Sequence, residues 1–252
     1  MKDLCVIGSG NMGKAMIKGI IRANLLKPSQ IVATDVSEAK IKELEKELGV
    51  GGTCDNHVAA GESRVVVLAV KPQFYDTAIS SIADVIKPET IIVSIVPGKT
   101  LERLEEKFKE GAEIVRAMPN IPDMVLAGMT AICGNSQVTE REINYVKQLF
   151  SGFGKMEKVS EYLMDVVVVV SGSSPAYVCL LIEAMADMAA KEGMSRQQAY
   201  IFSEQAVMGS AKLLLETEMH PGELKDTVCS PGGTSIEAVN VLEREKFRGI
   251  VI

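Results

Sequence analysis

The sequence predicts an α/β protein in which a doubly wound, mainly parallel sheet is followed by an all-helical part. Short apolar runs rich in β-branched residues alternate with stretches of helical spacing through residues 1–156. These runs lack the polar alternation of a half-exposed strand, which indicates burial on both faces. Beyond residue 156 the glycine turns thin out and long helical patterns take over. We therefore expect two domains, 1–156 and 157–252.

Six of the apolar runs are predicted as strands. Between the first two runs, apolar residues at helical spacing, such as Met12, Met16 and Ile20, predict a helix that covers the sheet. Strand–helix–strand alternation over this length is typical of a doubly wound sheet. The predicted strands span residues 4–7, 31–34, 65–70, 91–95, 114–117 and 129–132.

The helical part contains two long apolar helices. Pro175 suits the first turn of a helix that runs to about Lys191, and a second helix is predicted from Arg196 to about Leu215. The valine run 166–170 is ambiguous, because β-branching favours a strand whereas its helical neighbourhood favours a helix, and we predict a buried helix. Apolar helices in a segment this short have little to pack against in their own chain, so we expect a second copy to cover them.

Composition excludes several classes of partner. The 252-residue chain carries a formal net charge of −6, and 47% of its residues are hydrophobic. An acidic chain offers no basic field to nucleic acid or to an anionic membrane. Polar residues and Pro175 interrupt the apolar region 163–182, so no membrane span is expected. The N-terminus, where an apolar run leads straight into a glycine turn, does not resemble a signal peptide.

Cysteine and histidine usage indicates a reducing cytoplasm and no metal site. The five cysteines are odd in number and scattered, with no C-x-x-C pair, so no disulfide framework is expected. His57 and His220 each lack a second ligand at metal spacing. We expect a cytoplasmic protein without a metal.

A glycine-rich turn after the first predicted strand has the spacing of a dinucleotide-binding fingerprint. It reads Gly8-Ser9-Gly10-Asn11-Met12-Gly13 and opens a predicted helix. The first glycine permits a tight turn, the second lets a pyrophosphate approach the backbone, and the third lets helix and strand pack closely. Free N–H groups at the helix N-terminus would bind the phosphates. The alternative, a glycine turn without a ligand, is disfavoured by the flanking strand and helix.

Two charged residues stand at the ends of other predicted strands. Asp35 follows the second strand, about 20 residues after the glycines, where an acid hydrogen-bonds the ribose of NAD and repels the 2′-phosphate of NADP. Alternatively, Asp35 caps the helix that begins near Ser37. Lys71 directly follows the third strand and either faces phosphate or ribose or is a solvated loop cation. NADH and NADPH both stay open as the cofactor.

A second glycine motif, Ser230-Pro231-Gly232-Gly233-Thr234-Ser235, leads into a predicted helix. Thr234 and Glu237 fit a capping box in which Thr234 is the N-cap. Capping explains neither glycine, whereas successive N–H groups before a helix form a cradle for an anion such as a carboxylate. If Thr234 is occupied in capping, Ser235 is the hydroxyl free to hydrogen-bond a ligand there.

Five motifs together resemble those of the pyrroline-5-carboxylate reductase family, whose members form L-proline. The likeness extends along essentially the whole chain. The first of the five motifs is shared by many dehydrogenases, whereas the last two are specific to the family. They are Gly8-Ser9-Gly10-Asn11-Met12-Gly13, Ala69-Val70-Lys71-Pro72, Arg116-Ala117-Met118-Pro119-Asn120, Ser171-Gly172-Ser173-Ser174-Pro175-Ala176-Tyr177 and Ser230-Pro231-Gly232-Gly233-Thr234.

The resemblance implies an N-terminal Rossmann domain and a helical domain that interlocks with a second subunit, giving a homodimer that often assembles into a ring of dimers. It also implies hydride transfer from NADPH or NADH to the C=N bond of 1-pyrroline-5-carboxylate, the last step of proline biosynthesis, without a metal. Ser235 and Thr234 are the implied catalytic residues, and Ser235 stands where many members have a threonine.

The implied binding residues fall into two sets. Those for the nucleotide are Ile7, Gly8, Ser9, Gly10, Asn11, Met12, Asn56, Ala69, Val70, Lys71, Pro72, Ile95, Val96 and Pro97, beside Gly13 and Asp35 named above. Those for the substrate are Ser230, Gly232, Gly233, Thr234, Ser235 and Glu161.

Three departures and two alternatives accompany the resemblance. Members commonly have two small residues where this chain has Val96-Pro97. Many members prefer NADPH, which Asp35 disfavours. Members usually continue for another helix beyond the position of Ile252. A 3-hydroxyacid dehydrogenase would need a proton-relay lysine, yet Lys191 and Lys212 look like solvated helix positions. A non-catalytic dinucleotide-binding protein would not need the second glycine motif.

Overall fold

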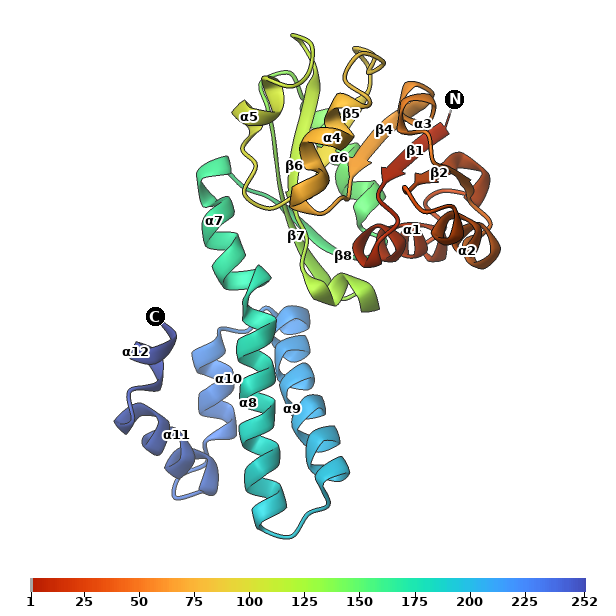
Figure 1. Ribbon diagram of the computed structural model, residues 1–252. Coiled ribbons are helices and arrows are strands. Elements are labelled where there is room, and N and C mark those ends of the chain that lie inside the picture. The colour runs from red at the N-terminus through yellow and green to blue at the C-terminus, as the bar shows by residue number, and fades with distance from the viewer. Residues whose placement is uncertain (1) are drawn as a thin grey trace. The chain divides into compact units, whose positions relative to one another are not determined.

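A computed structural model describes residues 2–252 of the chain (Figure 1). The chain divides into two compact units, the first ending at Ala176 and the second spanning Tyr177–Ile252. The first unit is an eight-stranded sheet covered by helices, and the second consists of helices alone. The predicted fold class, a doubly wound sheet followed by an all-α part, is confirmed.

The sheet has the strand order β3-β2-β1-β4-β5-β6-β7-β8. Every neighbouring pair is parallel except β6 and β7, which are antiparallel. The carboxyl ends of β1, β2, β4, β5 and β6 therefore lie at one edge, where ligands of open α/β sheets bind. The strands span Lys2–Ile7 (β1), Ile31–Thr34 (β2), Gly51–Thr53 (β3), Ser63–Leu68 (β4), Ile91–Ser94 (β5), Glu113–Met118 (β6), Gly128–Gly134 (β7) and Gly154–Lys158 (β8).

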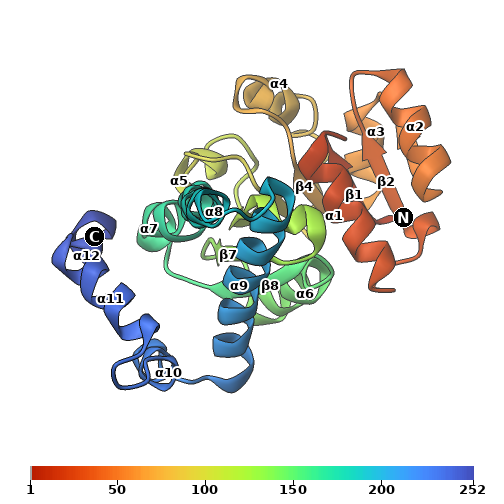
Figure 2. The ribbon, with the colours of Figure 1, turned by 90° about the horizontal axis from the view of Figure 1, so that it is seen from below.

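Helices cover both faces of the sheet (Figure 2). Residues of α1, α2 and α6 pack into one apolar cluster, and residues of α3, α4 and α5 pack into a second one. Central strands contribute alternate residues to the two clusters, as strands buried on both faces must. The α-helices of this unit are Asn11–Arg22 (α1), Glu38–Leu48 (α2), Asn56–Gly61 (α3), Tyr75–Ser80 (α4), Leu101–Glu105 (α5), Glu140–Phe150 (α6) and Met164–Val167 (α7).

All six predicted strands are confirmed, but β3 and β8 escaped prediction. Both are edge strands. β3 consists of Gly-Gly-Thr, and in β8 only Met156 is buried. Neither segment carries the β-branched, apolar run that identifies a strand buried on both faces.

The boundary between the compact units falls later than the predicted division at 156/157. Met164 is completely buried and packs in the same cluster as Leu104 and Ala131 of the sheet unit. Its contacts keep the segment after β8 with the first unit as far as Ala176.

The valine run 166–170 is helical, as predicted, but not buried. It begins in α7 and continues into a π-helical turn, η5 (Val168–Gly172). Val169 and Val170 are 59% and 68% exposed. These side chains are not buried by their own chain, and their burial by a second copy stays a prediction.

The second unit is built from long helices with few buried residues. Among the described residues of this unit, only Ala186, Ala199 and Ser203 are buried. The two long helices begin and end close to their predicted positions. The helices are α8 (Ser174–Lys191), which begins in the first unit, α9 (Arg196–Thr217), α10 (Pro221–Val228), α11 (Thr234–Arg244) and α12 (Phe247–Val251).

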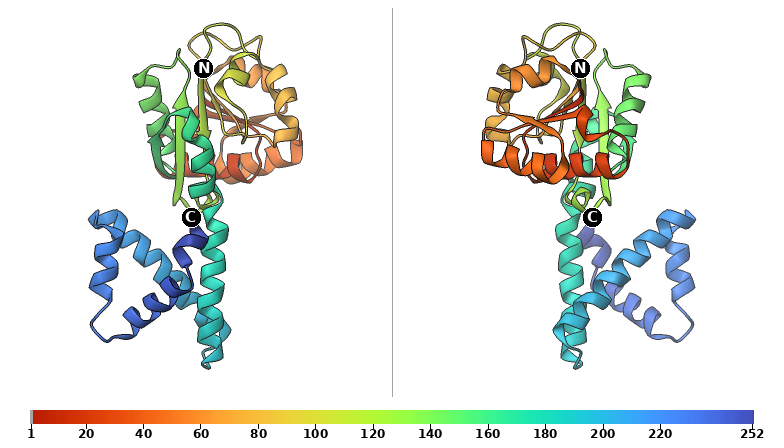
Figure 3. Two further views of the ribbon diagram at one scale, coloured as in Figure 1. Left: turned by 90° about the vertical axis from the view of Figure 1, so that its left-hand side faces the viewer. Right: turned by 90° about the vertical axis from the view of Figure 1, so that its right-hand side faces the viewer.

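The helical run Glu161–Lys191 is long and apolar enough to cross a membrane, judged by length and composition alone. We expected the polar residues and Pro175 to break this region, but the π-helical turn lets the helix continue through them (Figure 3). A helix that packs against other helices of a soluble protein meets the same criteria of length and composition.

Asp123, in the 3₁₀ segment η3 (Ile121–Val125), is a fully buried carboxyl group. Neither of its oxygens has a hydrogen-bond partner among the described residues 2–252. Burial raises the pKa of Asp123 to about 7. A Cβ at Gly128 would lie 1.3 Å from Asp123 Oδ1, so the carboxyl group occupies the space that any other residue at 128 would fill.

We expect Asp123 to make the protein less stable as pH rises. Its folded pKa lies above the ordinary value, so its stabilising contribution is complete below about pH 4 and is lost as the pH rises through 7. Between pH 5.5 and pH 7 the expected loss is about 2 kcal/mol of the free energy of unfolding. Asp123→Asn stays neutral and should lack this loss. Urea unfolding of both proteins at several pH values measures the difference, and parallel curves would contradict the prediction.

Candidate active site

The glycine-rich turn after β1 is shaped by two steric requirements. Gly8 has φ +102°, and a Cβ there would lie 2.6 Å from the Ala69 carbonyl oxygen. A Cβ at Gly13 would lie 2.1 Å from the Gly8 carbonyl oxygen. Both positions therefore need glycine for the protein's own packing.

Gly10 is not required by the protein's own packing. A Cβ there would meet no atom of the protein within 4 Å. Gly10 is the N-cap of α1, makes no side-chain cap and has no acidic residue in the turn after it. The free N–H groups at this helix end face open space, which is the arrangement that binds a phosphate.

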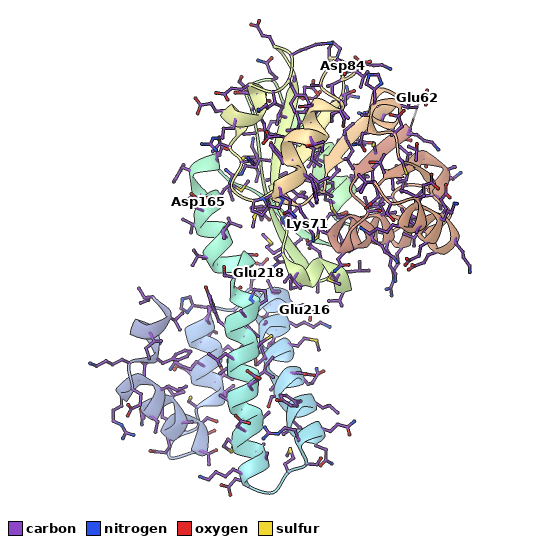
Figure 4. All side chains as sticks on the ribbon, viewed as in Figure 1. Glu62, Lys71, Asp84, Asp165, Glu216 and Glu218 are labelled. Carbon is purple, nitrogen blue, oxygen red and sulfur yellow. The ribbon has the colours of Figure 1, made fainter. Side chains whose placement is uncertain are left out.

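A cavity of about 320 Å³ lies beside this turn, at the carboxyl edge of the sheet. Eight of the predicted nucleotide residues line it, namely Ile7, Gly8, Gly10, Asp35, Asn56, Ala69, Val70 and Lys71. Lys71 lies three residues beyond the end of β4 and is exposed (Figure 4). Ser9, Asn11, Met12, Gly13, Pro72, Ile95, Val96 and Pro97 are not in its lining.

Several lining residues were missed from the sequence. Lys40, Thr77 and Ser81 supply polar groups, while Thr34, Val36, Phe74 and Ala78 complete the wall. The one sequence signal for them is that Thr77 and Ser81 are spaced by one turn of the helix that follows Lys71.

Asp35 binds the glycine turn directly. Its carboxylate accepts hydrogen bonds from the Ser9 N–H (3.2 Å), the Ser9 hydroxyl (2.9 Å) and the Ser37 N–H (3.1 Å). Lys40 Nζ lies 3.5 Å from it. Partial burial raises the pKa of Asp35, but these hydrogen bonds and the charge of Lys40 outweigh burial and hold the pKa below its ordinary value. The N-cap of α2 is Ser37, so the alternative role of Asp35 as the helix cap is not what the structure shows.

Two side-chain hydrogen bonds fix the amide group of Asn56. The Thr34 hydroxyl donates to its Oδ1 (2.5 Å), and its Nδ2 donates to the Ser81 hydroxyl (3.1 Å). This fixed amide lines the cavity on the side of β2 and α4.

The end of β5 contributes no predicted nucleotide residue to the lining of this cavity. Ile95 and Val96 are buried, and Pro97 beyond them is exposed. Their role toward a nucleotide stays a prediction.

Glu161 lies in the first unit and is already engaged. Its Oε1 accepts a hydrogen bond from the Leu101 N–H (2.7 Å) and lies 3.1 Å from Nη1 of the buried Arg116. These contacts tie the start of α5 to β6. A role for Glu161 in binding substrate stays a prediction.

The second glycine motif forms a turn at the start of α11. The N-cap is Gly233, which is extended, so the helix begins at Thr234 and the predicted capping box with Glu237 is absent. Thr234 as the N-cap was wrong because the glycine takes that position. Gly232 has φ +69°, and the Gly233 N–H donates to the Ser230 carbonyl (3.0 Å) to close the turn.

The hydroxyls of Thr234 and Ser235 in this motif are free. Within residues 2–252, the side chains of Thr234 and Ser235 make no hydrogen bond. A Cβ at Gly232 would meet no atom within 4 Å. The motif therefore offers backbone N–H groups and two hydroxyls to one anion, and we call residues 230–235 the cradle.

Comparison with known proteins identifies the family. A family model described as pyrroline-5-carboxylate reductase dimerisation matches residues 161–252, and one described as NADP oxidoreductase coenzyme F420-dependent matches residues 3–98. The pyrroline-5-carboxylate reductase of Escherichia coli K12 is 45% identical over 251 residues, covering 100% of this chain and 93% of the relative. The chain belongs to the pyrroline-5-carboxylate reductase family.

Solved structures of other family members agree. The reductase of Coxiella burnetii superposes with a TM-score of 0.95 at 34% identity, over 99% of this chain and 93% of that one. The pyrroline carboxylate reductase of Plasmodium falciparum, solved with NADP bound, gives a TM-score of 0.85 at 29% identity, over 99% and 92% of the two chains. The reductase fold therefore extends over both units of this chain.

Proposed function

We propose that this protein reduces 1-pyrroline-5-carboxylate to L-proline with NAD(P)H, the last step of proline biosynthesis. The observation that carries the proposal is the near full-length identity to a pyrroline-5-carboxylate reductase. The geometry supports it, because a dinucleotide turn and an anion cradle are both intact in the chain. A non-catalytic nucleotide-binding protein would have no use for the cradle, and membership of this family disfavours the 3-hydroxyacid dehydrogenase.

The residues of the first unit fit a dinucleotide. The open space and free N–H groups at Gly10 suit its pyrophosphate, and Asp35, Asn56 and Lys71 line the adjoining cavity, where ribose hydroxyls or phosphates would be held. The bound nucleotide supplies the hydride. Among residues 2–252 no cluster of His, Cys, Asp or Glu side chains suits a metal ion.

The cradle suits the substrate's carboxylate. Backbone N–H groups at residues 232, 234 and 235 would bind the carboxylate, because the Gly233 N–H is used within the turn. The hydroxyl of Ser235 or Thr234 would hydrogen-bond the ring nitrogen. Such a donor stabilises the charge that builds on the nitrogen during reduction. Since neither hydroxyl is used in capping, both are candidates, with Ser235 retained as the first.

Neither histidine lines the cavity or belongs to the cradle. His57 Nε2 lies 3.2 Å from the carboxylate of Asp84, and His220 Nδ1 accepts a hydrogen bond from the Gly222 N–H at the start of α10. We infer that the imine nitrogen takes its proton from water and that the chain contributes chiefly by positioning the two reactants.

Removing a cradle hydroxyl is expected to slow turnover. We expect Ser235→Ala to lower kcat about 10-fold, because a hydrogen bond to a developing charge is lost. Thr234→Ala tests the second hydroxyl in the same way. Ser210→Ala, whose hydroxyl bonds its own helix backbone at Ala206, is the control and should leave kcat unchanged. A change in kcat below about twofold for Ser235→Ala would remove that residue from the mechanism.

Asp35 is expected to govern the choice of cofactor. Its ionised carboxylate would repel the 2′-phosphate of NADPH, so Asp35→Ser should raise the ratio of kcat/KM for NADPH to that for NADH by about 10-fold. Asp35→Asn keeps an acceptor for the Ser9 N–H and removes only the charge, so the same direction of change is expected. An unchanged ratio in both variants would show that Asp35 serves only the glycine turn.

The helical unit supports a homodimer in the cytoplasm. A dimerisation family model covers it, and its apolar side chains are largely unburied in one chain. Assembly into a ring of dimers is part of the same proposal. The net charge of −6 supports a protein that binds neither nucleic acid nor a membrane, and the apolar run Glu161–Lys191 is assigned to subunit contact.

One assay of enzymatic turnover tests the activity. Oxidation of NADH and of NADPH is followed with 1-pyrroline-5-carboxylate, and reduction of NAD+ and of NADP+ is followed separately with 3-hydroxyacids. Turnover with the imine alone supports the reductase. Turnover with hydroxyacids alone, or nucleotide binding without any turnover, would overturn it.

A further inference from the structure

Two motifs that the proposed chemistry does not use meet within the first unit. Asn120, just beyond the carboxyl end of β6, donates from Nδ2 to the carbonyl oxygen of Ser171 (3.2 Å) and to its hydroxyl (3.1 Å). Next to it, a Cβ at Gly172 would lie 3.6 Å from Met118 Cε, so strand end and helix approach closely. The motifs 116–120 and 171–177 therefore form one contact.

The carbonyl of Ser171 lacks its regular helical donor. In an α-helix the N–H of residue 175 would donate to the carbonyl of residue 171, but Pro175 has no N–H. The chain is already loosened here, because the Ser173 N–H donates to the Val168 carbonyl (2.8 Å), the five-residue step of a π-helix. Asn120 supplies the missing donor, and the Ser174 hydroxyl lies 3.5 Å from the same oxygen.

The other half of the Asn120 amide is anchored in the sheet. Its Oδ1 accepts the N–H of Met129 in β7 (2.9 Å). One side chain thus joins the antiparallel pair β6–β7 to the turn η5. The joint lies at the sheet edge that also holds the glycine turn, since β1 and β6 end at the same edge.

We propose that Asn120 is a positioning residue for hydride transfer, which ties η5 to the nucleotide-bearing end of the sheet and so fixes where α8 begins. The proposal rests on the proposed reductase function. Helix α8 continues into the second unit and lies in the segment matched by the dimerisation family model, so its start is the point at which the sheet is joined to the proposed subunit contact. Because misplacement of reactants by about 1 Å can cost about 100-fold in rate, a loosened link lowers kcat and leaves nucleotide affinity intact.

The first test compares two asparagines of the same kind. Asn120→Ala is expected to lower kcat at least 10-fold, while the Kd for NADPH changes less than twofold. Asn135 is the matched control: its Oδ1 accepts the Ile114 N–H (3.2 Å) and its Nδ2 donates to the Ala112 carbonyl (2.9 Å), at the opposite end of β6. Asn135→Ala should lower Tm while leaving kcat within twofold. An unchanged kcat in Asn120→Ala, or a Kd for NADPH that rises in step with the loss of kcat, would overturn the proposal.

A double variant separates positioning from simple stabilisation. Asn120→Ala/Pro175→Ala restores a backbone N–H for the Ser171 carbonyl but not the tether to the sheet. We expect this variant to regain Tm without regaining kcat. Recovery of both would show that Asn120 only satisfies a carbonyl. Turnover of the wild type is measured alongside: a wild type without turnover defeats the proposed function and this inference together, whereas an active wild type with an unaffected Asn120→Ala defeats this inference alone.

Discussion

Leu180→Lys is expected to dissociate the dimer and to unfold much of the helical unit. Leu180 lies in α8 and is 68% exposed in the single chain, and Phe202 in α9 is 66% exposed. If a second copy covers these side chains, each substitution acts twice in a symmetric dimer. Losing about 2–3 kcal/mol of apolar burial in each copy weakens association by about 1,000-fold or more.

Two measurements check this prediction. Sedimentation should show monomers at concentrations where the wild type is dimeric, and circular dichroism should show a loss of helix. Phe202→Lys should give the same two results, monomers in sedimentation and a loss of helix in circular dichroism. Val58→Lys, at an apolar side chain of the sheet unit that is 54% exposed, is the matched control and should remain dimeric. A Leu180→Lys protein that keeps its size and helix content would show that this face is not the interface.

Gly10→Ala is expected to abolish tight nucleotide binding in a protein that folds normally. The added Cβ meets no protein atom, and the backbone of Gly10, with φ −70° and ψ −175°, is accessible to alanine. The methyl group would instead occupy the space through which a pyrophosphate approaches the helix end. We expect the Kd for NADPH to rise about 100-fold with Tm unchanged.

Gly13→Ala provides the contrast. Its Cβ would lie 2.1 Å from the Gly8 carbonyl oxygen, so α1 must move away from β1 and Tm should fall. Fluorescence titration with NADPH and thermal unfolding of both variants distinguish the two effects. Equal affinities for wild type and Gly10→Ala would mean that the pyrophosphate does not approach this turn.

The central sheet was predictable because burial on both faces leaves an unmistakable pattern. The runs at 65–70 and 91–95 have no polar alternation, and each became a central strand. The edge strands β3 and β8 have no such pattern, because one side of an edge strand pairs with nothing and its residues stay exposed. The valine run 166–170 shows how far an apolar sequence predicts burial. Such a run indicates that its side chains need an apolar partner surface, but it does not indicate whether the same chain supplies that surface.

The site was predictable where backbone conformation dictates the residue, and not where distant side chains meet. The spacing of glycines 8, 10 and 13 alone predicts the glycine-rich turn and the helix that follows it. The bond from Ser9 to Asp35 and the approach of Asn120 to Ser171 join residues far apart in the chain, and one sequence offers no signal for either. The helix start at residue 234 was misplaced by one position because both glycine and threonine are acceptable N-caps.

The scarcity of buried residues in the second unit has a kinetic consequence. Residues Tyr177–Ile252 bury only Ala186, Ala199 and Ser203 among the described residues, so this half of the chain has little to gain from folding alone. In the proposed dimer, its folding becomes a bimolecular event in which two chains with folded sheets complete each other. The yield of active enzyme would rise with the concentration of newly made chains, and a chain with a damaged nucleotide site would still capture a sound one in a mixed pair.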